Sequence, residues 1–294
     1  MKYANLHMHS IYSDGIYTPL ELCQLAAQKG FQAVALTDHE TTRGLAKMHE
    51  AAAAYGLECV SGIEITAHGL GVRAGGFHIV GLDFDPAHPR MRAYTEWTEQ
   101  NITELSIRRL EHCLKEGSIH GITWKDVEER FPDVGWYCNE QVFKLLQERQ
   151  GLADTDYWTF VNHFNGAPVK GVSNSLPAEE AIDVIRASGG VAVLAHPHLQ
   201  TQYLSDLRAM GLGGVEVDHP DLTEEDSAEA NRLAQELGLY CSGGTDHTGL
   251  LGNSMKRGNG AVLTNIPLVP YDADVSNGAT REAFEAIKAR AKRC

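Results

Sequence analysis

Residues 4–39, ANLHMHSIYSDGIYTPLELCQLAAQKGFQAVALTDH, contain a strand–helix–strand unit that decides the fold class. Ala4–His9 and Gln32–Thr37 are short apolar segments of the kind that form buried strands. Between them, Pro19–Lys29 has helical periodicity, with Thr18 at the N-cap position. Two strands joined through a helix predict parallel pairing in an α/β sheet.

The same alternation of strands and helices continues through most of the chain. Residues 91–167 interrupt it, because they contain helical patterns and no strand signal. We therefore predict an α/β scaffold from residues 1–90 and 168–294, with a helical cap inserted at residues 91–167. Beyond the opening unit, the scaffold strands are expected at residues 58–65, 77–84, 190–195, 214–217 and 239–243, and its helices at 43–55, 178–187, 204–210, 224–237 and 281–292.

Composition restricts the classes of partner. The 294 residues carry 39 acidic and 25 basic side chains, a net charge of -14. This charge disfavours duplex nucleic acid but allows a small anionic substrate that is bound through local cations such as metal ions. No segment approaches the roughly 20 continuous apolar residues that cross a bilayer. Six cysteines without a CxxC pair, and no apolar leader, predict reduced thiols and a cytoplasmic location.

Metal-ligating residue types stand at nearly every predicted strand. Ligand sites of parallel α/β folds lie at the carboxyl ends of the strands, so these side chains are expected to converge. Two histidines on one strand face could instead form a polar rim, but repetition at six or seven strands favours several divalent ions. In chain order the candidate metal ligands are His7, His9, Asp14, His39, Glu64, His78, His196, Asp246 and His247.

Five motifs resemble those of the PHP (polymerase and histidinol phosphatase) superfamily: His7-Met8-His9-Ser10 with Ser13-Asp14-Gly15, Leu36-Thr37-Asp38-His39, Gly62-Ile63-Glu64, Ala195-His196-Pro197 and Gly244-Thr245-Asp246. The resemblance implies a distorted seven-stranded (β/α) barrel with two to three divalent ions, Mn first and Fe or Zn as alternatives. Transferred by position, the ligand sets are His7, His9, Glu64 and Asp246 for the first ion, Glu64, His78 and His196 for the second, and Asp14 and His39 for the third.

The last motif departs from the family pattern. The family usually has Asp-x-His there, whereas His247 directly follows Asp246. Because adjacent strand residues point to opposite faces, His247 would need a local change of backbone to reach the third ion. We expect it to be a ligand; a third site with fewer protein ligands is the alternative.

The chain has a helical insertion after the fourth strand. In this feature it resembles a bacterial subgroup of the superfamily whose members are similar to 3',5'-nucleoside bisphosphate phosphatases. Some of these proteins also trim short RNA from its 5' end. The resemblance implies that a metal-bound hydroxide, bridged at Glu64, attacks phosphorus. Lys170 and Arg43 are candidate phosphate ligands, and His219 could bind phosphate or donate a proton. Gly135 of the cap is followed by Trp136 rather than by the arginine that the subgroup leads us to expect.

Other functions stay open on the sequence. A histidinol-phosphate phosphatase would use the same ions with another pocket. A non-catalytic metal-binding module would be expected to have lost ligands, and nearly all are present. A C–N hydrolase of the amidohydrolase type would be expected to carry a lysine ligand at a strand end, and none precedes Lys170. The aromatic residues of the cap could stack on a nucleobase or form the core of the cap itself.

Overall fold

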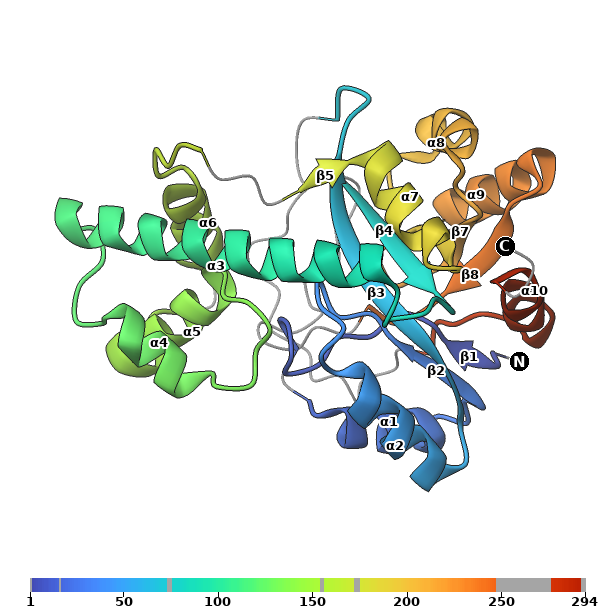
Figure 1. The fold of residues 1–294 in the computed structure, drawn as a ribbon, viewed down its shortest axis with the longest axis horizontal. Coiled ribbons are helices and arrows are strands. Elements are labelled where there is room, and N and C mark those ends of the chain that lie inside the picture. The colour runs from blue at the N-terminus through green and yellow to red at the C-terminus, as the bar shows by residue number, and fades with distance from the viewer. Residues whose placement is uncertain are drawn as a thin grey trace.

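The computed structural model describes residues 2–15, 17–72, 76–153, 156–171, 175–246 and 276–291. Within these ranges, one mixed sheet has the strand order β1-β2-β3-β4-β6-β7-β8, and β5 pairs with β3 (Figure 1). The strands are β1 (Ala4–Asn5), β2 (Ala33–Leu36), β3 (Glu58–His68), β4 (Phe77–Leu82), β5 (Leu176–Pro177), β6 (Val191–Leu194), β7 (Gly214–Asp218) and β8 (Tyr240–Gly243). The helices are α1 (Pro19–Gln28), α2 (Leu45–Tyr55), α3 (Pro89–Glu116), α4 (Trp124–Arg130), α5 (Asn139–Gln150), α6 (Tyr157–Asn165), α7 (Ala178–Ala187), α8 (Leu204–Met210), α9 (Glu224–Leu237) and α10 (Arg281–Ala291).

Backbone hydrogen bonds bring the two ends of this strand order together. Leu6 donates its N–H to the carbonyl oxygen of Gly243 at 3.2 Å. The N–H groups of Thr245 and Asp246 both donate to the carbonyl oxygen of His7, at 3.1 and 2.9 Å. The sheet is therefore a nearly closed barrel surrounded by helices, which confirms the predicted fold class.

The first strand is shorter than predicted. We expected a strand over Ala4–His9, but the ladder between β1 and β2 ends at Asn5. Beyond this point the chain leaves the ladder, because His7 is bonded to the end of β8 while Met8 accepts from Thr37 N at 2.8 Å. His7 and His9 thus lie in the segment that follows β1.

One strand departs from the parallel pairing that strand–helix–strand units lead us to expect: β4 runs antiparallel to both β3 and β6. Only residues 69–76 separate β3 from β4, and a parallel crossover needs a dozen or more residues. The reversal places the start of β4 beside the end of β3, where His78 pairs in register with Thr66. His78 consequently lies at the same edge of the barrel as the ends of the parallel strands.

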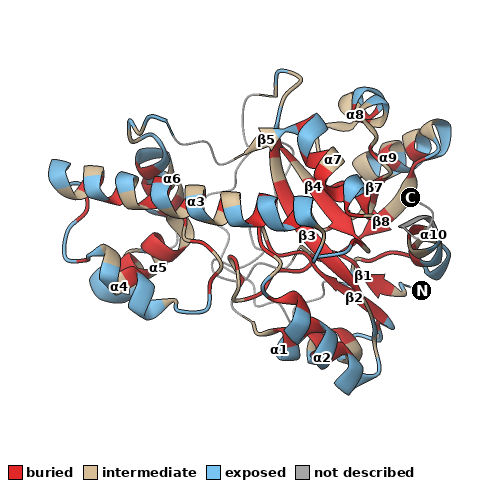
Figure 2. Cartoon of the chain, in the orientation of Figure 1, coloured by how far each residue is buried: buried red, intermediate tan, exposed pale blue. Residues whose placement is uncertain are grey.

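Side chains alternate between the two faces of the strands, as a period of two requires. In β2, Ala33 and Ala35 belong to an apolar cluster inside the barrel, whereas Val34 and Leu36 pack among the surrounding helices. α10 contributes Phe284 and Ile287 to the interior cluster. Figure 2 shows the strands buried and the helices exposed on their outer faces. The barrel interior is therefore apolar up to the edge where the predicted ligands lie.

The inserted helices α4–α6 build an apolar cluster of their own, which includes Val127, Phe143 and Phe164. α3 joins the two parts, since Tyr94 packs with the barrel helices and Leu110 with the cap (Figure 1). None of the described helices is both long and apolar enough to cross a membrane.

Candidate metal centre

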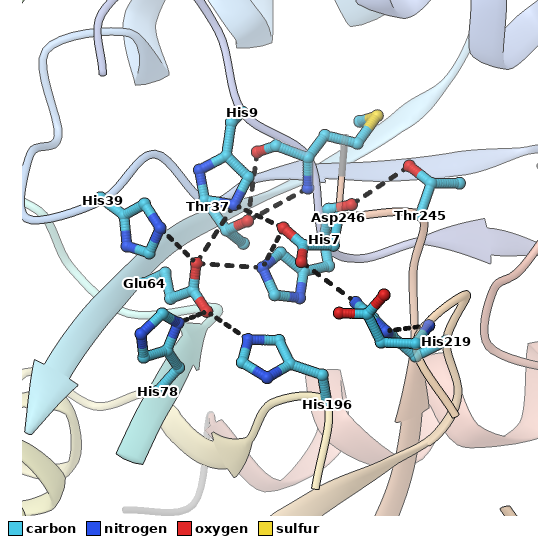
Figure 3. A network of polar contacts seen from close by, with 12 residues as sticks. His7, His9, Thr37, His39, Glu64, His78, His196, His219, Thr245 and Asp246 are labelled. Atoms are coloured by element: carbon cyan, nitrogen blue, oxygen red, sulfur yellow. Dashed lines mark hydrogen bonds and ion pairs between the residues drawn. The ribbon is translucent and has the colours of Figure 1, made fainter. Parts of the chain in front are cut away.

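Eight of the predicted ligands lie together, with the carboxylate of Glu64 at their centre. Figure 3 shows this cluster apart from Asp14. Oε2 of Glu64 lies 3.2 Å from His7 Nε2, 3.1 Å from His9 Nε2 and 3.2 Å from His39 Nε2. Oε1 lies 3.0 Å from His78 Nδ1 and 3.3 Å from His196 Nε2. One buried carboxylate thus contacts five imidazoles that come from distant parts of the chain.

Two aspartates complete the cluster. Asp246 Oδ1 lies 3.4 Å from His7 Nε2 and 3.2 Å from His9 Nε2, and Asp14 Oδ1 lies 3.3 Å from His9 Nδ1. Among the described residues, four compact groups of possible ligand atoms result. Three consist of predicted ligands: His7, His9, Glu64 and Asp246; His9, Asp14 and His39; and His39, Glu64 and His78. The fourth joins His7 to Glu216 and His219.

The donor atoms fit divalent metal ions. His7 Nε2, both ring nitrogens of His9 and Glu64 Oε2 are buried and lack a hydrogen bond. Leaving such atoms unsatisfied is costly, and imidazole and carboxylate are good ligands for Mn, Fe and Zn. With bonds of about 2.1 Å, ligand atoms on one tetrahedral ion would lie about 3.4 Å apart, close to the separations in the cluster.

Comparison with known proteins also supports a metal centre at this site. Residues 5–146 match the PHP domain family. The phosphoribosyl 1,2-cyclic phosphate 1,2-diphosphodiesterase of Eggerthella lenta is 30% identical over 268 residues, which cover 84% of this chain and 95% of the relative. The chain belongs to the PHP family. It is accordingly a metal-dependent phosphoesterase.

Two further relatives and a solved structure agree with this membership. The 3',5'-nucleoside bisphosphate phosphatase of Chromobacterium violaceum is 30% identical, with 82% of this chain and 86% of the relative covered. The 5'-3' exoribonuclease of Haemophilus influenzae is 29% identical, covering 82% and 88%. A Bifidobacterium adolescentis protein assigned to the metal-dependent phosphoesterases shares the fold, with a TM-score of 0.79 at 24% identity over 98% of this chain and 96% of that one.

Loops of this PHP barrel are held in place by a buried carboxylate that is not a predicted ligand. Asp38 accepts hydrogen bonds from Ser10 N at 2.6 Å, Ser10 Oγ at 2.7 Å and Ser13 Oγ at 2.8 Å. Ser13 Oγ also lies 2.9 Å from Asp14 Oδ1. Asp38 thereby fixes the loop that carries Asp14.

Unusual backbone conformations also occur at the centre. His196 and Asp246 have φ values of 28° and 46°, in the left-handed region that residues other than glycine rarely adopt. Such conformations persist only where surrounding contacts hold them, and they are common at functional sites. At Asp246 the contact is the hydrogen bond from its own N–H to His7 O.

Two acidic residues near the metal centre were not predicted as site residues from the sequence. Glu216, in β7, lies 3.0 Å from His7 Nδ1 through Oε1. Glu40 follows His39, and its carboxylate accepts hydrogen bonds from Thr66 N at 2.7 Å and from Tyr94 Oη. Burial raises the pKa of Glu40 to about 7. For Glu216 the available signal was its position between the apolar strand residues Val215 and Val217.

The three residues predicted to contact substrate do not lie together. Arg43 pairs with Glu99 of α3, with Nη2 2.7 Å from Oε2, and Lys170 is exposed beside the cap. His219 is buried at the centre, with Nε2 3.3 Å from Asp246 Oδ2. His247 lies outside the described residues. The structure therefore brings His219 to the metal centre and leaves Arg43 in an ion pair.

The aromatic residues of the cap pack mainly with one another. Trp124 contacts Tyr137 edge-on, and Tyr157 contacts Trp158. Trp136 is buried, and its indole N–H donates to the carbonyl oxygen of His39. This packing favours the cap-core interpretation of these rings over base stacking.

Electrostatics make the centre a place for positive charge. Burial lowers the pKa of His7, but Glu216, Glu64 and Asp246 raise it more, so it ends well above its usual value. Burial likewise lowers the pKa of His9, and Asp14 more than reverses this. Burial raises the pKa of Glu64, yet the imidazoles of His39, His7 and His78 bring it well below its usual value. Without metal, protons on His7 and His9 supply charge that cations would otherwise supply, whereas burial lowers the pKa of His39 to about 4.

Metal binding to the PHP centre is therefore expected to release protons. The raised pKa values keep His7 and His9 protonated up to higher pH, so protons compete with metal even near neutrality, and metal affinity should fall as pH falls. Titration of metal-free protein with Mn²⁺ in two buffers of different ionisation enthalpy measures the release. We expect at least one proton per protein at pH 7, and equal heats in both buffers would contradict this.

Proposed function

We propose that this PHP enzyme removes the 3'-phosphate from 3',5'-nucleoside bisphosphates and also trims short single-stranded RNA from the 5' end. The observation that carries the proposal is a cavity of about 220 Å³ between the loop after β1 and the cap. Ser13 and Gly15, which flank Asp14, line it on one side, and Val134, Gln141 and Lys144 line it on the other. Because Ser13 and Gly15 flank Asp14, the cavity lies next to the loop that carries a proposed ligand, and we infer that a substrate with one phosphate at the metal centre extends toward it.

The lining suits the second half of such a substrate. Phe131 and Val134 offer apolar surface for a base or ribose, and Lys144 offers a cation for a second phosphate. Arg130 also lines the cavity but is committed to Glu148, with both contacts at 2.8 Å. Among the described lining residues, Asp133 is the one acidic side chain, which favours an arrangement with the second phosphate near Lys144.

The cap is fastened to the loops of the metal centre. Gly135 donates its N–H to Tyr12 O at 2.7 Å, and Gln141 Nε2 donates to Ser13 O at 2.9 Å. A Cβ at Gly135 would lie 2.7 Å from Thr41 Oγ1, so the close approach needs glycine. The cap thus stands where it can select the leaving group and exclude water from the reacting phosphate.

The chemistry is a hydrolysis at phosphorus. Bound divalent ions, Mn²⁺ first, would acidify a water and withdraw charge from the phosphoryl oxygens. His219 Nδ1 accepts a hydrogen bond from Asp221 N at 3.0 Å, so the neutral ring carries its hydrogen on Nε2, which faces Asp246. His219 can therefore donate at this atom.

We assign His7, His9, Glu64 and Asp246 to the first ion, Glu64, His78 and His196 to the second, and Asp14 and His39 to the third.

A second candidate substrate is a phosphoribosyl cyclic phosphate. The relative that acts on such a compound aligns over 95% of its length. Ring opening of a cyclic diester followed by loss of phosphate needs the same metal centre, and the ribose of this substrate also carries a second phosphate. The two candidates therefore differ in the nucleobase, which only the bisphosphate would place against the apolar lining of the cavity.

The first experiment compares substrates directly. Mn²⁺-loaded protein is expected to release phosphate from 3',5'-adenosine bisphosphate faster than from phosphoribosyl cyclic phosphate or histidinol phosphate, measured as kcat/KM. His196→Ala should lower every rate by roughly a thousandfold, because losing a metal ligand removes several kcal/mol of charge stabilisation. A higher kcat/KM for the cyclic phosphate would reverse our ranking, and no release from any phosphate ester would refute both candidates.

The second experiment tests the cavity. Lys144→Ala should raise KM for 3',5'-adenosine bisphosphate about tenfold, the worth of one charge-assisted hydrogen bond, and leave p-nitrophenyl phosphate hydrolysis unchanged. Lys125→Ala is the matched control, because Lys125 lies on the outer surface of the cap beside Glu129. Equal effects of the two variants would remove Lys144 from the site.

A further inference from the structure

Glu216 is a charged residue in the middle of an apolar strand. It lies in β7 between Val215 and Val217, and only 1% of it is exposed. Burying a carboxylate is costly unless donors surround it. The donors in this case come from two residues that we assign to the metal centre.

The two carboxylate oxygens have different partners. Oε1 lies 3.0 Å from His7 Nδ1, and Oε2 accepts the backbone N–H of His196 at 2.7 Å. His219 Nε2 stands farther away, 4.0 Å from Oε2. One side chain thus contacts a ring nitrogen of one candidate ligand and the main chain of another.

The contact with His7 decides which ring nitrogen can bind a metal ion. An ionised carboxylate only accepts, so His7 Nδ1 must carry the hydrogen. The neutral ring then has its lone pair on Nε2, the atom that lies 3.2 Å from Glu64 Oε2 and 3.4 Å from Asp246 Oδ1. A carboxylate behind a ligating imidazole fixes the tautomer and orientation of that ring.

The contact with His196 holds a backbone conformation. His196 has a φ of 28°, which is unfavourable for a residue with a side chain. Without the Glu216 carboxylate, the N–H of His196 would have lost this hydrogen-bond acceptor in the observed backbone conformation. In the observed conformation, His196 Nε2 reaches to 3.3 Å from Glu64 Oε1.

We propose that Glu216 is a positioning residue of the metal centre, which sets the tautomer of His7 and the backbone conformation of His196 at the same time. The inference rests on the proposed roles of these histidines as ligands. Glutamine is the informative replacement, because it has one oxygen and cannot accept from both donors. If the glutamine oxygen still accepts the N–H of His196, the glutamine amide N–H faces His7 Nδ1. That contact favours the tautomer of His7 that carries its hydrogen on Nε2.

The experiment measures metal affinity without any phosphate ester, so its outcome is independent of the substrate. Glu216→Gln is expected to weaken Zn²⁺ binding about 10- to 100-fold in a chelator competition, the usual effect of removing such a partner. Glu216→Asp keeps the charge and should restore part of the affinity. Asp218→Asn is the matched control on the same strand, because Asp218 accepts from Asn277 Nδ2 and Gly278 N and contacts none of the proposed ligands.

Wild-type affinity in Glu216→Gln, or an equal loss in Asp218→Asn, would overturn the proposal. Circular dichroism of the metal-free variants shows whether each is folded. If Glu216→Gln does not fold, the wild-type protein decides. In the Zn²⁺-loaded, histidine-labelled enzyme, long-range ¹H–¹⁵N correlations should show the hydrogen of His7 on Nδ1, and a hydrogen on Nε2 would refute the assignment.

Discussion

The structure depends on a single buried negative charge, the carboxylate of Glu64. Five imidazoles approach its two oxygens within 3.3 Å. A buried carboxylate needs hydrogen-bond donors or positive charge around it. At Glu64 the positive charge can come from protons on these rings or from cations bound among them. The barrel must therefore bring distant segments to one point and leave room there for ions. Closure makes this possible at Gly244, where a Cβ would lie 2.4 Å from the backbone nitrogen of His7.

The sequence predicted the cluster better than the sheet around it. Ligand-type residues at strand ends are informative because the ends of parallel strands share one edge, and eight of them do converge. The direction of β4 did not follow from the sequence pattern, since hydrophobic periodicity is the same in either direction. His78 nevertheless reaches the centre, because the start of an antiparallel strand lies at the edge where its neighbours end.

Residues that act through others were the hardest to predict. Glu216 has no motif spacing, and its role follows only from the folded positions of His7 Nδ1 and His196 N. Arg43 was a reasonable phosphate ligand by its place after Thr37-Asp38-His39, but the cap brings Glu99 within 2.7 Å of its guanidinium. Contacts between barrel and cap join residues far apart in the chain, so no local pattern could reveal them.

The connection between cap and centre explains how one metal cluster can serve different substrates. Glu40 donates its N–H to Glu64 O at 2.9 Å, and its carboxylate accepts from Tyr94 of α3, while Trp136 donates to His39 O. These contacts reach the backbone or the second layer of the centre and leave the ligand atoms free. The cap has its own apolar core, so its lining can change without disturbing those atoms. Relatives of similar length accordingly carry names for a cyclic phosphate, a nucleoside bisphosphate and RNA. On the proposed function, the barrel would supply the reaction, and the surface that the cap turns toward the centre would select the molecule.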